Sequence, residues 1–132
     1  MKLAILIQDE SARSSAGVRI RYKRLRSTLA LLDCELSITP ILNLCSSLDF
    51  SCDVYIFSKC YTFESIILSS ILVGKGKLVG CDIFDDYFSS VADSRFDDFR
   101  NWLSRFSLFA NFITCSTERL GDVVRKFATE IP

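Results

Sequence analysis

The sequence predicts an α/β fold: a three-layer domain in which a five-stranded parallel sheet is covered by helices on both faces. Two observations carry this prediction. Short apolar runs alternate with segments of helical periodicity along almost the whole chain, which is the order that gives parallel strands joined by right-handed crossovers. The first run, at residues 3–7, is continuously apolar, as expected of a central strand that is buried on both faces. A length of 132 residues fits one domain with a single core.

Five segments are predicted as strands because each is a short apolar or β-branched run bounded by turn-forming or charged residues. In chain order they are residues 3–7, 35–39, 53–58, 77–83 and 111–115. Pro40 is expected to end the second strand, since proline cannot donate a hydrogen bond to a neighbouring strand.

The first predicted helix is amphipathic and basic. Its apolar residues recur at spacings of four, three, four and three, which indicates about four helical turns; they are Val18, Tyr22, Leu25, Leu29 and Leu32. Its other faces carry only positive charge, from Arg19, Arg21, Lys23, Arg24 and Arg26. Residues 82–98, by contrast, hold six aspartates and a single arginine.

Two further helices are predicted from their capping residues. Thr62 is expected to cap a helix over residues 62–73, with Glu64 in its first turn. Ser94 and Asp97 fit a capping box ahead of another amphipathic helix.

The last helix is expected to begin at the cap Ser116. Residues 41–52 are ambiguous, with one short helical turn as the alternative to a loop. Ile131 and Pro132 follow the last helix, and we expect them to begin a connection to further chain.

Composition excludes several classes of protein. The chain has no histidine, so a Ser-His-Asp or Cys-His nucleophile and a histidine-ligated metal site are excluded. Six cysteines without a CxxC pair indicate free thiols in a reducing, cytoplasmic setting rather than a zinc site. The formal net charge of zero argues against a nucleic-acid binder. The longest apolar run is too short to span a bilayer.

The loop after the first strand is the first candidate site. Gly17 and the serines before it lie ahead of a helix, where backbone amides can bind an anion. Arg19 and Arg21 would add positive charge. The alternative is an ordinary loop followed by a solvated basic helix face.

The acidic end of the fourth strand is the second candidate site. Asp82, Asp85 and Asp86 could accept hydrogen bonds from sugar hydroxyls, hold a metal or act as a base; the alternative is that they form the loop or cap a helix. Lys59 follows the third strand and is expected at the same edge of the sheet. The alternative for Lys59 is a solvated loop lysine.

Four segments carry a resemblance to a known family: SAGVRIRY at 15–22, DVYIFSKCY at 53–61, GKLVGCDIFDDYFS at 76–89 and FITCSTERL at 112–120. Together they resemble the N-terminal half of a GT-B type glycosyltransferase, of the group-one kind that builds capsule or lipopolysaccharide. The resemblance implies that residues 1–132 form one Rossmann-like, acceptor-side domain. By this resemblance the C-terminal donor-binding domain would be absent from this chain.

The resemblance also implies a function and a set of site residues. The enzyme would transfer a sugar from a nucleotide-sugar co-substrate to a glycan or lipid-linked acceptor at the cytoplasmic face of a membrane, with no metal and no tightly bound cofactor. The domain alone would be incomplete and would need the donor domain or a separate subunit. The implied residues, catalytic first and then substrate-binding, are Asp85, Asp82, Gly17, Arg19, Arg21, Lys59, Ser116 and Thr117.

Two alternative functions remain open. One is a non-catalytic, flavodoxin-like interaction module. A receiver of this type needs an aspartate at the end of the third strand, where Ser58 and Lys59 stand here. The other is a docking subunit of a split glycosyltransferase.

Overall fold

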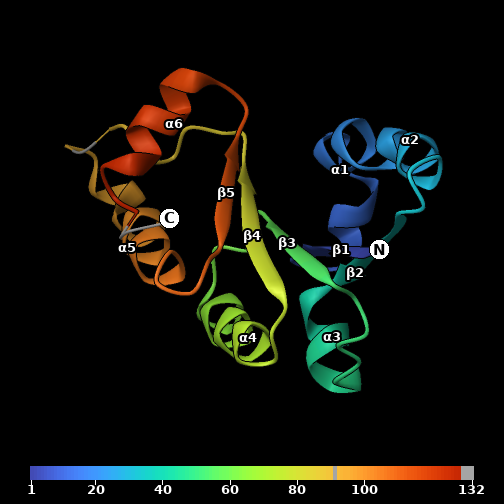
Figure 1. The fold of residues 1–132 in the computed structure, drawn as a ribbon. Helices are drawn as coiled ribbons and strands as arrows, with labels where there is room; N and C mark the ends of the chain where they lie inside the picture. The colour runs from blue at the N-terminus through green and yellow to red at the C-terminus, as the bar shows by residue number, and fades with distance from the viewer. Residues whose placement is uncertain (91, 129–132) are drawn as a thin grey trace.

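A computed structural model describes residues 1–90 and 92–128, and it confirms the predicted α/β fold (Figure 1). Five strands form one parallel sheet in the order β2-β1-β3-β4-β5. The strands are β1 (Lys2–Ile7), β2 (Glu35–Pro40), β3 (Val54–Ser58), β4 (Leu78–Ile83) and β5 (Phe112–Cys115). Pro40 is the last residue of β2 rather than the residue after it, and β2 lies at the edge of the sheet, where a proline is tolerated.

Helices cover both faces of the sheet, as predicted. On one face lie α1 (Ala16–Arg21) and α2 (Arg26–Ala30), and on the other lie α3 (Ile41–Ser47), α4 (Phe63–Gly74), α5 (Asp97–Phe106) and α6 (Glu118–Arg125) (Figure 1). The face under α4, α5 and α6 holds the larger core, which includes Phe57, Trp102 and Phe106. The smaller core joins α1 to β1 and β2 through residues such as Val18 and Ile38.

The strand register aligns polar residues across the sheet near its carboxyl edge. Ser58 of β3 pairs with Asp82 of β4, and Asp82 pairs with Thr114 of β5. Their side chains therefore project from the same face, the one that carries α1. The opposite, amino edge holds the start of the chain, where the Met1 ammonium donates a hydrogen bond to the carbonyl of Asp33 (3.1 Å).

The prediction of one four-turn helix after β1 is wrong. The segment is divided into α1, a 3-10 turn η2 (Lys23–Leu25) and α2. α1 ends at Arg21, and the side chains of Arg21 and Tyr22 are both bound to Asp82 of the sheet. Beyond this anchor only Leu29 of the apolar series packs against the smaller core, since Leu25 is 49% exposed and Leu32 is 71% exposed.

Two of the predicted helix caps are also wrong. The cap of α6 is Thr117, whose hydroxyl accepts a hydrogen bond from the Leu120 amide (3.2 Å), and not Ser116. The expected Ser94–Asp97 capping box is replaced by Asp93, which caps a short 3-10 turn, η3 (Ser94–Phe96), ahead of α5.

Two further expectations concern α3 and the chain end. Residues 41–47, within the ambiguous segment, form α3, which is nearly two turns long. Ile131 and Pro132, where we expected a connection, lie outside the described residues. Within the described part of the chain no helix is long and apolar enough to cross a membrane.

Candidate functional site

The carboxyl edge of the sheet gathers most of the predicted site residues. The connection that leaves β1 runs to one face, and the connection that leaves β3 runs to the other, so the topological switch point lies between these two neighbouring strands. Open parallel sheets bind ligands just outside this point. Lys59 follows β3, Asp85 follows β4, and Ser116 follows β5, so three adjacent strands each deliver one polar residue to this edge.

Phe84, which sequence analysis did not select, is the centre of this edge. The Arg21 guanidinium lies 4.6 Å from the centroid of its ring, and the Lys59 ammonium lies 4.7 Å from it. A Cβ atom on Gly17 would lie 3.2 Å from the ring, a tight contact that would require the ring to shift, so α1 packs closely against Phe84 here. The Ser116 hydroxyl donates a hydrogen bond to the Phe84 carbonyl (3.4 Å). The structure therefore places Gly17, Arg21 and Lys59 around one aromatic ring, with Ser116 at the backbone carbonyl of the same residue.

Lys59 and Asp85 form an ion pair at this edge. The Lys59 Nζ lies 2.5 Å from an Asp85 carboxylate oxygen, and the two side chains are 46% and 39% exposed. Both charges thus remain accessible to a ligand, and an exposed pair of this kind contributes only about 0–1 kcal/mol to stability. Lys59 has a φ of +55°, a left-handed conformation that residues other than glycine rarely adopt. Such strained positions concentrate at functional sites.

Asp82 is buried under this edge and has four hydrogen-bond donors. Its side chain is 4% exposed, and it accepts hydrogen bonds from Arg21 Nε (2.7 Å) and Nη2 (2.6 Å). It also accepts hydrogen bonds from the hydroxyls of Tyr22 (2.6 Å) and Thr114 (2.9 Å). This arrangement fastens α1 to β4 and β5 and holds the Arg21 guanidinium beside Phe84. A role of Asp82 as an acid or a base stays a prediction; the geometry gives it a positioning role.

The electrostatics of this buried group follow from the same contacts. The hydrogen bond to Asp82 raises the pKa of Arg21 above its ordinary value, so the guanidinium stays charged. Burial raises the pKa of Tyr22, and the neighbouring Asp82 raises it further. Tyr22 therefore remains a neutral donor at any physiological pH. Sequence analysis had counted Tyr22 as apolar and had not considered Thr114.

The remaining predicted site residues make no hydrogen bond or ion pair with Phe84 or Asp82 through their side chains. Arg19 is exposed on α1, and its side chain makes no hydrogen bond or ion pair with another described residue. Thr117 is used as the cap of α6. Asp86, next to Asp85, closes the loop by accepting hydrogen bonds from the amides of Phe88 and Ser89.

Two buried oxygen atoms near the switch point have no hydrogen-bond partner in the described part of the chain: Gln8 Oε1 and Thr62 Oγ1. Gln8 directly follows β1, and Thr62 lies between β3 and α4, where its hydroxyl makes no capping bond. An unpaired buried polar group costs about 1–3 kcal/mol, so each needs an explanation. Both belong to the loops that flank the switch point. The sequence signal for Gln8, a polar residue directly after a buried strand, had been overlooked.

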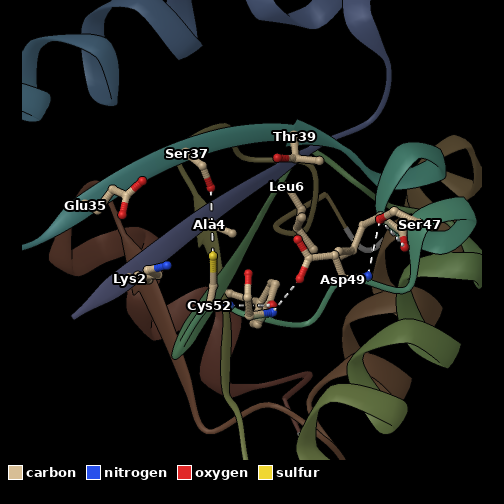
Figure 2. Close-up of a pocket in the computed structure, with 12 residues that line it drawn as sticks. Lys2, Ala4, Leu6, Glu35, Ser37, Thr39, Ser47, Asp49 and Cys52 are labelled. Atoms are coloured by element: carbon tan, nitrogen blue, oxygen red, sulfur yellow. Dashed lines mark hydrogen bonds between the residues drawn. The ribbon is translucent and has the colours of Figure 1, made fainter.

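A separate polar cavity of about 250 Å³ lies on the opposite face of the sheet, against β1 and β2 (Figure 2). Its lining includes Lys2, Glu35, Ser37, Thr39 and Asp49, together with the buried Ala4 and Leu6. Leu44 and Ser47 of α3 also line the cavity. No predicted site residue lines the cavity, although the polar alternation of Glu35, Ser37 and Thr39 was visible in the sequence.

Comparison with known proteins yields no relative. No protein-family model matches the chain, and no curated protein or solved structure shows significant similarity to it. Among the described residues, no three cysteine, aspartate or glutamate side chains converge to hold a metal ion.

Proposed function

We propose that this chain is the acceptor-side domain of a GT-B type glycosyltransferase, which transfers a sugar from a nucleotide-sugar to a glycan or lipid-linked acceptor. The observation that carries the proposal is the Lys59–Asp85 pair, an accessible cation and carboxylate on neighbouring strand ends. They lie at the edge of a doubly wound sheet where such folds bind ligands.

Each residue of this edge has a distinct role in the proposal. Asp85 accepts the proton of the acceptor hydroxyl, and the oxygen of that hydroxyl attacks the anomeric carbon of the donor sugar. The bond from the anomeric carbon to the donor phosphate breaks at the same time. Lys59 neutralises the phosphate that leaves with the nucleotide. Arg21, held in place by Asp82, adds a second positive charge near Lys59. Ser116, which follows β5, offers a hydroxyl.

The domain would work together with a second part. A nucleotide-sugar needs contacts to its base and ribose that this edge does not supply. A C-terminal domain or a separate subunit would bind those parts of the donor, and this edge alone would bind its phosphates weakly. A lipid-linked acceptor would bring the assembled enzyme to the cytoplasmic face of a membrane, as a peripheral protein.

Ligand titration tests the proposal on the domain as it exists. We expect UDP, or a UDP-sugar, to shift amide resonances of residues 15–22, 58–61 and 84–86 in nuclear magnetic resonance spectra. Lys59→Ala should weaken this binding about tenfold or more, which is the value of one charge-assisted hydrogen bond. Lys77→Ala is the matched control, because Lys77 precedes β4 at the opposite edge of the sheet.

The result that would contradict the proposal is equally direct. If a panel of nucleoside diphosphates and their sugar conjugates leaves these resonances unmoved at millimolar concentration, the nucleotide-sugar function is wrong. Equal binding by wild type and the Lys59→Ala variant would remove Lys59 from the site. The absence of any nucleotide binding would favour the interaction-module alternative.

A further inference from the structure

The outward side of α4 is apolar, which is unusual for a helix on the surface of a domain. The only charged residue of this helix is Glu64, in its first turn. Phe63, Ile67 and Ile71 are 63%, 46% and 43% exposed. Their spacing of four residues places them in one stripe along the helix. A surface helix normally carries polar residues there, so an apolar stripe indicates a face that binds a partner.

Residues near α3 widen this stripe into a groove of about 470 Å³. Leu48, which is 65% exposed, and Phe50 form its other wall. The ends of the groove carry opposite charges: Glu64 at one end, and Lys75 at the other, where its ammonium lies 5.3 Å from the centre of the Phe50 ring. Neither Glu64 nor Lys75 has an ion-pair partner within residues 1–90 and 92–128.

We propose that this surface, called the α4 face and made of Leu48, Phe50, Phe63, Ile67 and Ile71, binds a second copy of the chain. The two α4 helices pack antiparallel about a two-fold axis. The charges support this arrangement, because a two-fold axis perpendicular to α4 exchanges its two ends. Glu64 of each copy then faces Lys75 of the other, whereas a parallel arrangement would bring like charges together.

The spacing along the helix fits this symmetry. Glu64 and Lys75 are eleven positions apart, which is about 16 Å along the helix axis at 1.5 Å per residue. The midpoint lies between Ser69 and Ser70, and the exposed Ser70 is small enough to let the helices approach closely. About this midpoint, Ile67 of one copy lies within one residue, or about 1.5 Å, of the level of Ile71 of the other. The contact is isologous and closes as a dimer.

Measurement of molecular mass tests the dimer. Sedimentation equilibrium of the full chain should show a monomer–dimer equilibrium that depends on concentration. Ile67→Glu should shift it to monomer, because a carboxylate would be placed in the apolar contact. Ile20→Glu is the matched control: Ile20 is 54% exposed on α1, far from the α4 face, and this variant should dimerise like wild type.

Charge reversal tests the antiparallel orientation of the two α4 helices. Glu64→Lys or Lys75→Glu alone should raise the dimer dissociation constant about fivefold, since each change places like charges together at two symmetric contacts. The double variant should return to within about twofold of wild type. Both residues are exposed, so folding is retained and circular dichroism will verify it.

Three results would overturn the proposal. They are a folded wild-type chain that stays monomeric at millimolar concentration, an Ile67→Glu variant that still dimerises, and a double charge reversal that does not restore association. The last result would refute the antiparallel arrangement, because only that arrangement places Glu64 of each copy against Lys75 of the other.

Discussion

Replacement of Asp82 by alanine tests how α1 is fastened to the sheet. Asp82 is only 3% exposed, and its carboxylate accepts hydrogen bonds from Arg21, Tyr22 and Thr114. Loss of one partner from a buried ion pair costs about 3–5 kcal/mol. The Arg21 side chain is 31% exposed and can regain water, which places the expected loss near the lower end, at about 3 kcal/mol. Urea denaturation followed by circular dichroism measures it.

A double-mutant cycle separates this anchor from a general effect on folding. Tyr22→Phe removes one hydrogen bond to a charged acceptor, which is worth about 1.5–3 kcal/mol. In the Asp82→Ala background the same change should cost almost nothing, because the acceptor is already absent. If Asp82→Ala lowers the free energy of unfolding by less than 1 kcal/mol, or if the two losses simply add, the anchoring role is wrong.

Three further predictions concern the free energy of unfolding, each measured by urea denaturation. The free energy of unfolding of Lys59→Gly should be about 1 kcal/mol larger than that of Lys59→Ala, because only glycine adopts a φ of +55° without strain. Equal stabilities would contradict this. Burial raises the pKa of the Cys60 thiol from 9.0 to about 12. The contribution of the neutral thiol to the free energy of unfolding is therefore complete below pH 9 and is lost as the pH rises toward 12. Above pH 9 the free energy of unfolding of Cys60→Ala should therefore fall less steeply than that of wild type, by about 1.4 kcal/mol per pH unit. An unchanged slope would refute this prediction. Gly80→Ala should cost about 1–3 kcal/mol, since its Cβ would lie 2.4 Å from the Phe112 ring; the cost should shrink when Phe112→Ala is also present, and a constant cost would argue against this contact.

The strands were predictable because their signal is local. Residues 3–7 are apolar on both faces, and the structure places β1 in the interior of the sheet, between β2 and β3. Each predicted strand agrees with the observed one to within a residue or so at either end. Alternation with helices then fixed the parallel direction, since parallel neighbours require a crossover between them.

The broken first helix shows the limit of periodicity. Apolar spacing indicates which side of a helix faces inward, but it does not show whether the sheet extends far enough to receive that side. Leu25 and Leu32 fit the pattern and yet remain largely exposed. The prediction of the α6 cap failed for a different reason. Ser116 and Thr117 are adjacent, both can cap a helix, and the sequence alone does not show which of them does.

The candidate site was predictable only where it depends on strand ends. Lys59 and Asp85 follow neighbouring strands, and their meeting was expected from topology. The Arg21–Asp82 pair joins residues 61 positions apart, and it depends on the face from which each side chain projects. Phe84 looked like one more apolar residue, because its role comes from the charged groups around it.

The position of Met1 has a practical consequence for experiments. Its ammonium is bound at the amino edge of the sheet, beside Asp33, so the chain starts on the side away from Lys59 and Asp85. An affinity tag or a surface linker attached at this end will point away from the carboxyl edge and leave it open to solution. The chain can therefore be immobilised through its N-terminus for ligand screening, and a backbone amide can take over the hydrogen bond to Asp33.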